Sequence, residues 1–283
     1  MPMNHRILRP LARPLLLDAV PGAAAAYSLR QLSNAYTGPV VTVRRSSDDA
    51  EADFKASEID DGTLAAFCGA GDGFVKTWFD QSGNTGRDAS QGTAGYQPKI
   101  VSSGSLVTEG GKPALEFDGS DDFFSASFGW AANAFSIFAI AARTSTSVYP
   151  AIIAEALGAT SGYLALGYNI VSGANLGEIA IHRVGLATAK SNLVPGDGVL
   201  RILSYISDGI IAGSVSVSVA MDAVNAAAPL TLSSLSSTST TNVGASKSGF
   251  ADRLDGTISE VIIYPSDQSA NRQRIEGDIA WYY

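Results

Sequence analysis

The stretch from Val199 to Ala220 reads VLRILSYISDGIIAGSVSVSVA and decides the fold class. Over Ser214–Ala220 valines alternate with serines, which places the valines on one face of an extended chain and the serines on the other. The apolar run Val199–Ile206 predicts the partner strand. Asp208-Gly209 between them is a strong hairpin signal, because glycine accepts the positive φ of a tight turn. The stretch therefore predicts antiparallel strands with one buried face.

Further strand signals recur along the chain, without helical patterns of roughly 10–15 residues between them, which favours an all-β sandwich or barrel over βαβ units. The expected strands are Ala114–Phe117, Phe135–Arg143, Gly162–Tyr168, Glu178–His182 and Thr257–Tyr264. Short helices are expected over Ala23–Leu32, Thr63–Cys68 and Ser269–Tyr283. The Ser/Thr-rich run Ser233–Thr241 is expected to be a surface loop.

Composition excludes several classes of protein. The 283 residues include 19 Lys+Arg against 27 Asp+Glu, a formal charge of −8 with a pI near 4.7, which does not suit a nucleic-acid binder. No stretch approaches about 18 consecutive apolar residues, so no membrane span is expected. Cys68 is the one cysteine, so an internal disulfide and a Cys/His zinc cluster are both excluded. No cofactor is expected.

The first 26 residues are basic and interrupted by prolines. Asp18 and Pro21 break the apolar run Leu15–Leu17, which is too short for the core of a secretory signal. We expect residues 1–26 to form an N-terminal docking arm that orders only against a neighbour, and residues 27–283 to form one sandwich domain. Secretion stays the alternative to folding and assembly inside a cell.

Several blocks resemble a known family. Tyr27–Arg30, Val43–Asp49 and Trp78–Asn84 (WFDQSGN) resemble the N-terminal half of the arabinofuranosidase B catalytic domain, and the segment from Gly256 to Asp267 resembles its last strand and the start of its closing helix. Leu115–Asp122 (LEFDGSDD) is similar to segments of the wider concanavalin A-like, laminin-G-like group. The resemblance implies an all-β, concanavalin A-like jelly-roll β-sandwich with a few short helices and an extended N-terminal arm.

The residues that make that family catalytic are not found at the matching places. The family's nucleophile is a glutamate in a Met-Glu-Asn-Asn context, and its acid is an aspartate in a Gly-Gly-Asp stretch. Their places here fall on Val184-Gly185 and on Val243–Ser246, which hold no carboxylate. The family's vicinal cysteine pair is also absent, because Cys68 is alone. We therefore expect a noncatalytic module and assign no catalytic residue.

A basic arm joined to such a jelly roll also resembles virion proteins of tailed bacteriophages. The expected function is a noncatalytic structural or receptor-facing virion component, a tail or capsid decoration or spike used in host attachment. It would dock on other virion proteins through residues 1–26, form a homo-oligomer with a trimer favoured, and bind host-surface glycans.

Two alternatives stay open. One is a free carbohydrate-binding lectin. The other is a glycoside hydrolase of the α-L-arabinofuranosidase type, with two carboxylates drawn from Asp80, Glu116, Glu155, Glu178 and Glu260.

Polar and aromatic side chains suggest a sugar site, with turn chemistry and core packing as the competing interpretations. Phe123 and Phe124 are adjacent, so an extended chain points them to opposite faces and we expect one to be exposed. Other aromatics, Tyr96 among them, could also stack on sugar rings, but most of the set is expected in the core. The candidate carbohydrate-binding residues are Asp80, Gln81, Asn84, Phe123, Phe124 and Trp130.

Two charged clusters have a structural alternative. Asp118, Asp121 and Asp122 are weak candidates for Ca²⁺, with a solvated turn as the alternative, because the spacing and closing glutamate of an EF-hand are missing. Arg44-Arg45 next to Asp48-Asp49 predicts a local charge network, with a binding patch as the alternative.

Overall fold

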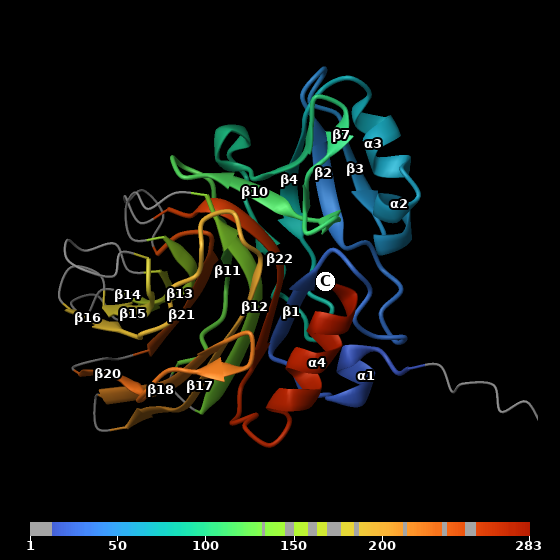
Figure 1. Ribbon diagram of the computed structural model, residues 1–283. Helices are drawn as coiled ribbons and strands as arrows, with labels where there is room; N and C mark the ends of the chain where they lie inside the picture. Colours follow the sequence, from blue (N-terminus) through green and yellow to red (C-terminus); the bar gives the residue numbers. More distant parts are fainter. Residues whose placement is uncertain are drawn as a thin grey trace, which may run out of the picture.

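The computed structural model describes residues 13–131, 134–144, 150–157, 163–168, 177–183, 187–211, 214–233, 237–246 and 253–283. The predicted fold class is confirmed, since the chain is an all-β sandwich of antiparallel strands with a few short helices (Figure 1). The helices are α1 (Leu16–Ala19), α2 (Ala56–Asp60), α3 (Thr63–Cys68) and α4 (Arg272–Tyr282), with one 3₁₀ turn, η1 (Ala94–Tyr96). Within the described residues no helix has the length and apolar content needed to cross a membrane.

One layer is built on a long C-terminal strand. Its members are β1 (Ala25–Ser28), β10 (Leu115–Asp118), β22 (Asp255–Tyr264), β12 (Phe135–Arg143), β17 (Arg201–Ile211), β18 (Ser214–Met221), β19 (Val224–Asn225) and β20 (Leu230–Ser233). β22 pairs with β12 along one edge, and along the other with β1 through its second half and β10 through its first half. Segments far apart in sequence therefore meet on one strand.

The facing layer runs β5 (Ala89–Ser90), β11 (Phe124–Ala126), β21 (Ser237–Val243), β13 (Ala151–Leu157), β14 (Tyr163–Tyr168), β15 (Ile179–Arg183) and β16 (Ala187–Lys190). The remaining strands are β2 (Val41–Arg45), β3 (Glu51–Phe54), β4 (Gly73–Trp78), β6 (Lys99–Ser102), β7 (Ser105–Leu106) and the hairpin β8 (Thr108–Glu109) and β9 (Lys112–Pro113). β4 pairs with both β5 and β6, and β6 pairs with β10, so this group connects the two layers.

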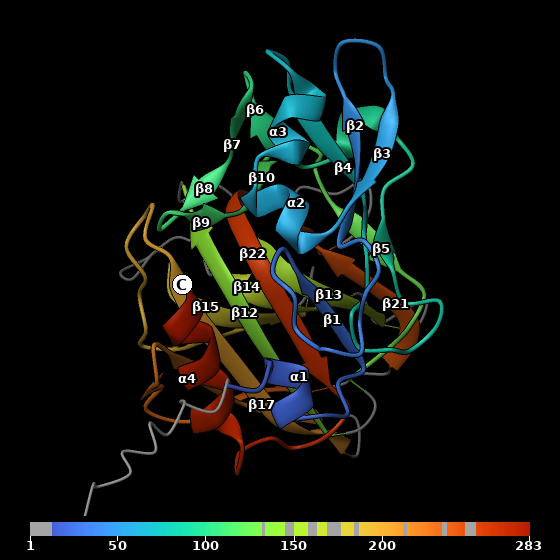
Figure 2. The same ribbon diagram turned by 90° about the vertical axis from the view of Figure 1, so that its right-hand side faces the viewer.

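The core follows from alternation along the strands. On β18 the valines 215, 217 and 219 are buried, whereas serines 216 and 218 are exposed, as the sequence pattern predicts. All nine residues of β12 are buried, because its inner face packs in the main core and Phe138 and Ile140 on its outer face pack against α1 and α4. Figure 2 shows both helices lying over the outer face of this layer.

The WFDQSGN block holds the N-terminal segment in place by hydrogen bonds. Asp80 Oδ1 accepts the backbone N–H of Ala26 at 2.7 Å, and Gln81 Oε1 accepts that of Leu32 at 2.9 Å. Asn84 Nδ2 donates to the carbonyl of Ala24 at 3.0 Å. These bonds satisfy backbone groups that would otherwise be buried without partners, so the block is chiefly turn and capping chemistry.

The N-terminal segment differs from the expectation. The described part of the expected arm, from Arg13 onward, packs on its own domain, with Leu16 fully buried and β1 crossing the expected boundary between residues 26 and 27. The helix expected over Ala23–Leu32 is therefore wrong, because pairing with β22 overrides the helix propensity of the alanines. Residues 1–12 lie outside the described residues.

Two local expectations are also wrong. Asp208-Gly209 lies inside β17 at a register shift opposite β18 instead of forming the hairpin turn; Gly209 takes the positive φ there. The expected loop Ser233–Thr241 contains most of β21, in which Thr241 is fully buried. The helix Thr63–Cys68 and the strand Phe135–Arg143 are confirmed with the expected bounds.

A buried ion pair joins three elements. Arg30 contacts Glu260 of β22 through Nε at 2.8 Å and through Nη2 at 3.0 Å, and Asp278 of α4 through Nη1 at 2.9 Å. The Arg30 and Glu260 side chains are 8% and 0% exposed. Such a pair is costly to break, because the remaining carboxylate stays buried without its cation.

Arg30→Met is therefore expected to lower the free energy of unfolding by about 3–5 kcal/mol in a urea titration. Lys76→Met is the matched control, because Lys76 and Glu51 form an exposed pair at 2.7 Å whose loss is expected to cost about 1 kcal/mol or less. Equal losses in the two variants would contradict this interpretation.

Candidate active site

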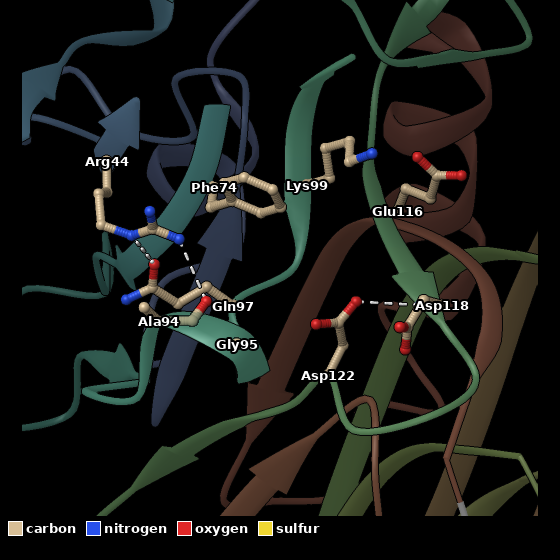
Figure 3. A pocket seen from close by; sticks show the side chains of 9 residues that line it. All are labelled: Arg44, Phe74, Ala94, Gly95, Gln97, Lys99, Glu116, Asp118 and Asp122. Carbon is tan, nitrogen blue, oxygen red and sulfur yellow. Dashed lines mark hydrogen bonds between the residues drawn. The ribbon is translucent and has the colours of Figure 1, made fainter. Parts of the chain in front are cut away.

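A pocket of about 370 Å³ opens beside β10, between that strand and the β2–β4–β6 group (Figure 3). Its walls combine acidic, basic and amide side chains with one aromatic ring. The lining residues are Arg44, Phe74, Ala94, Gly95, Gln97, Lys99, Glu116, Asp118 and Asp122. We call it the acidic pocket.

Strand alternation turns two carboxylates into the pocket. On β10 Leu115 and Phe117 are buried in the core, so Glu116 and Asp118 share the opposite, exposed face. β10 is held in this register by β22, where Asp118 lies opposite Asp255.

A tight turn brings the third carboxylate back to the strand. Asp118 Oδ1 accepts the backbone N–H groups of Ser120 at 2.8 Å and Asp121 at 3.3 Å. Gly119 has φ +74°, and a Cβ there would lie 2.7 Å from that of Asp255, so only glycine fits. The chain then returns until Asp122 Oδ2 accepts the N–H of Asp118 at 3.0 Å.

Asp118, Asp121 and Asp122 each have a carboxylate oxygen within 4.8 Å of the other two. The predicted grouping of these three residues is thus observed, and Ca²⁺ binding by them stays a prediction.

The surroundings of Asp122 alter its acidity. Its side chain is only 7% exposed, and burial raises its pKa to about 7, helped by the negative charges of Asp118, Asp121 and Glu116 and opposed by the hydrogen bond from Asp118. A carboxyl group that keeps a proton near neutral pH can donate it to a leaving oxygen, which is the property of a general acid.

The opposite wall of the pocket carries basic side chains that hydrogen bonds and ion pairs hold in place. Arg44 donates from Nε to Gln97 Oε1 at 2.9 Å and from Nη2 to the carbonyl of Ala94 at 3.2 Å (Figure 3). Its Nη1 donates to Asp49 Oδ1 at 2.6 Å. Lys99 lies opposite Glu116 on the neighbouring strand, and its ion pair with Asp72 is 3.4 Å long. The predicted charge network of Arg44 and Arg45 is therefore present, and Arg44 also lines the pocket.

The six expected sugar-contacting residues do not line the acidic pocket. Asp80, Gln81 and Asn84 bond to the N-terminal segment, as described above. The expectation that one of the two phenylalanines is exposed is wrong, because Phe124 is 0% and Phe123 is 7% exposed, and Trp130 is also buried. Phe124 packs on Trp78 and Phe117, and Trp130 on Phe135, so these rings fill the sandwich.

The five carboxylates considered for the hydrolase are used differently. Asp80 and Glu260 are structural, and Glu155 accepts the backbone N–H groups of Trp130 and Ala131 inside the sandwich. Glu178 is buried just before β15. Only Glu116 lines the acidic pocket, where it joins Asp118 and Asp122.

The sequence did not indicate the raised pKa of Asp122 or the place of Gln97 and Lys99 in the pocket lining. The alternation of apolar and acidic residues over Leu115–Asp118 predicts that Glu116 and Asp118 share one exposed face of a strand. The return of Asp122 depends on the turn geometry and on burial by distant segments, which no local pattern reports.

Comparison with known proteins points to one group. The sequence profile of the family described as alpha-L-arabinofuranosidase B, catalytic, matches residues 17–117. No curated protein sequence matches the chain significantly.

Solved structures agree with the profile. A GH54 α-L-arabinofuranosidase soaked with a cyclic sulfate inhibitor has a TM-score of 0.63 at 18% identity, covering 91% of this chain and 62% of that one. An arabinofuranosidase complexed with arabinofuranosyl-α-1,2-xylobiose has a TM-score of 0.61 at 18% identity, covering 93% and 64%. At such identities the likeness shows a shared fold, and this chain spans less than two thirds of the length of these enzymes.

A third structure is matched almost end to end. Domain 4 of AbnA, a GH43 extracellular arabinanase from Geobacillus stearothermophilus in complex with arabinotriose, has a TM-score of 0.50 at 11% identity, covering 92% of this chain and 98% of that one.

These findings correct the expected function. The profile matches residues 17–117, and the arabinofuranosidase structures share their fold with more than nine tenths of the chain, so the likeness is to an arabinofuranosidase catalytic domain and not to a virion protein. The expectation of a noncatalytic bacteriophage virion component is wrong. Of the two places where the family's carboxylates were sought, Val243–Ser246 is buried at the end of β21 and Val184-Gly185 lies outside the described residues.

The raised pKa of Asp122 predicts a pH-dependent stability. The folded chain holds this proton up to about pH 7, whereas an unfolded aspartate releases it near pH 3.8, so the folded state binds more protons between these values and loses stability as pH rises. Asp122→Asn is expected to stabilise the protein by roughly 2–4 kcal/mol at pH 8 in urea titrations, with a gain that shrinks toward pH 4.

Asp121→Asn on the same turn is the matched control and is expected to show little change. A gain from Asp122→Asn that is the same at pH 4 and pH 8 would contradict the raised pKa.

Proposed function

We propose that this chain is a glycoside hydrolase domain of the α-L-arabinofuranosidase type, with the acidic pocket as its active site. The observation that carries the proposal is Asp122, a buried carboxyl group with a pKa near 7 whose neighbour Asp118 lies within 4.8 Å, in a chain with an arabinofuranosidase-like fold. Retaining glycosidases place their two carboxyl groups about 5–5.5 Å apart, and inverting enzymes need about 6.5–9.5 Å. Oxygens of Asp118 and Asp122 within 4.8 Å of each other leave no room for the water that an inverting enzyme places between its carboxyl groups, so the retaining reaction is the one that fits better.

The two carboxyl groups have different surroundings and therefore different roles. Asp122 donates its proton to the glycosidic oxygen as the bond from that oxygen to the anomeric carbon breaks. Asp118 accepts the N–H groups of the turn through Oδ1, and its other oxygen, Oδ2, forms the covalent bond to the anomeric carbon. Asp122, now ionised, then removes a proton from the water that displaces Asp118.

The remaining pocket residues supply sugar recognition. Gln97 and Arg44 are fixed by their mutual hydrogen bond, and Glu116 and Lys99 stand side by side on neighbouring strands. A few converging polar groups around one aromatic ring, here Phe74, are typical of pockets that orient a sugar through its hydroxyl groups.

A second candidate is an arabinan-binding domain that does not cleave its ligand. It is favoured by the likeness to an arabinanase domain in complex with arabinotriose and by the lack of a carboxylate in Val243–Ser246.

The oligomeric state stays a prediction: a homo-oligomer, with a trimer favoured. Light scattering on a size-exclusion column measures the molar mass in solution and tests it.

Hydrolysis of 4-nitrophenyl α-L-arabinofuranoside tests the proposed function. We expect turnover that declines above about pH 7 as Asp122 loses its proton, and a loss of roughly 10²- to 10⁴-fold in kcat for Asp122→Asn. Asp121→Asn, the control on the same turn, is expected to keep most of the activity.

Absence of turnover in the parent chain, together with binding of arabinose oligosaccharides, would favour the noncatalytic candidate. Full activity in Asp122→Asn would move the active site away from the acidic pocket.

A further inference from the structure

Tyr96 is a partly exposed aromatic side chain beside the acidic pocket. Its exposure is 39%, whereas the aromatic residues expected to contact sugars are buried. An exposed ring alone is ordinary on a protein surface. Tyr96 differs from an ordinary exposed ring in two ways: its chain neighbours line the pocket, and packing and hydrogen bonds hold it in place.

The two chain neighbours of Tyr96 belong to the pocket lining. Tyr96 stands between Gly95 and Gln97, which both line the pocket, but is not itself part of the lining. Its ring packs on that of Phe123 with centroids 6.1 Å apart and planes at 38°, and Phe123 directly follows Asp122. The Tyr96 ring is therefore held next to the segment that carries the proposed acid.

The support of Tyr96 is rigid. Its backbone N–H donates to Thr93 at 3.0 Å, and its carbonyl accepts the N–H of Phe123 at 3.2 Å. Gln91 links Phe123 to Gln97, the residue after Tyr96. Its Nε2 donates to the carbonyl of Phe123 at 3.1 Å, and its own carbonyl accepts a hydrogen bond from Gln97 Nε2 at 2.9 Å. On the Phe123 ring lies the guanidinium of Arg253, 4.8 Å from the centroid. A ring held in advance in this way loses little freedom when a ligand stacks on it.

We propose that Tyr96 is a stacking platform for a second sugar unit that projects from the acidic pocket. Because Tyr96 lies outside the pocket lining, a single sugar bound inside has no need of it, whereas the next unit of a chain passes over the rim. The ligand is then an arabinose-containing oligosaccharide or polymer branch, which makes the substrate class narrower than any arabinofuranoside. This inference rests on the proposed placement of the sugar in the acidic pocket.

The test measures binding separately from hydrolysis. Isothermal titration calorimetry with arabinotriose and with arabinose is carried out on Asp122→Asn, a background in which turnover is expected to be strongly reduced, and on the same background with Tyr96→Ala. We expect Tyr96→Ala to weaken arabinotriose binding by roughly 3- to 10-fold and to leave arabinose binding unchanged within twofold. Tyr96→Phe, which keeps the ring, is expected to keep the affinity.

Trp281→Ala is the matched control, because Trp281 is 74% exposed and lies on α4, outside the pocket lining. It is expected to change neither affinity. Thermal melts of all variants show whether the fold is retained. If Tyr96→Ala is unstable, Tyr96→Leu replaces it, because leucine removes the ring and keeps an apolar contact for Phe123.

Arabinotriose affinity that is unchanged by Tyr96→Ala, or an equal loss for arabinose and arabinotriose, would overturn the platform. Binding that depends on Tyr96 in a chain that hydrolyses nothing supports the platform and removes the hydrolase function. Hydrolysis by the parent chain, with arabinotriose binding that Tyr96→Ala leaves unchanged, supports the hydrolase function and overturns the platform. Failure of both sugars to bind overturns the platform.

Discussion

The pairing of β22 with three separate segments is the constraint on which the rest of the structure depends. Its first half aligns β10, so that Asp118 lies opposite Asp255, and its second half aligns β1 at the other end of the same edge. The opposite edge is closed by β12, and the two strands approach so closely that a Cβ at Gly256 would lie 2.1 Å from the carbonyl oxygen of Ala142. One strand near the C-terminus thereby sets the register of the N-terminal segment and of the strand that carries two carboxylates of the pocket.

Two buried carboxyl groups near β22, Glu260 and Asp122, have different surroundings. Glu260 on its second half is neutralised by Arg30, with Ser28 Oγ donating to it at 2.7 Å, so this buried carboxylate is structural. Asp122, near the first half, is buried without a salt-bridge cation among the described residues, and burial together with the neighbouring carboxylates raises its pKa. The cation beside Glu260 makes that carboxylate part of the fold, whereas Asp122 keeps its proton near neutral pH and is the group available for acid chemistry.

Much of the sandwich could be predicted from local patterns. The Val/Ser alternation of β18, the apolar run of β12 and the helix Thr63–Cys68 each carry their own signal. The alanine-rich β1 could not be predicted, because its conformation is decided by a strand more than two hundred residues away. Asp208-Gly209 carries a turn signal that the long pairing of β17 with β18 overrides with a register shift.

The site was harder to predict than the fold. Its acid depends on burial by segments that are distant in sequence, and its opposite wall comes from β2 and β6. The polar residues of the WFDQSGN block suggest a sugar site, yet their side chains form hydrogen bonds with backbone groups of Ala23–Leu32. The lack of carboxylates at the family's matching places also gave more weight to a noncatalytic function than the comparisons allow.

A crystal structure of the Asp122→Asn variant soaked with 4-nitrophenyl α-L-arabinofuranoside tests the central claim most directly. We expect the arabinose ring in the acidic pocket, with its anomeric carbon near Asp118 and its glycosidic oxygen near residue 122. A sugar bound at another place on the sandwich, with the acidic pocket free of it, would contradict the assignment of this pocket as the active site.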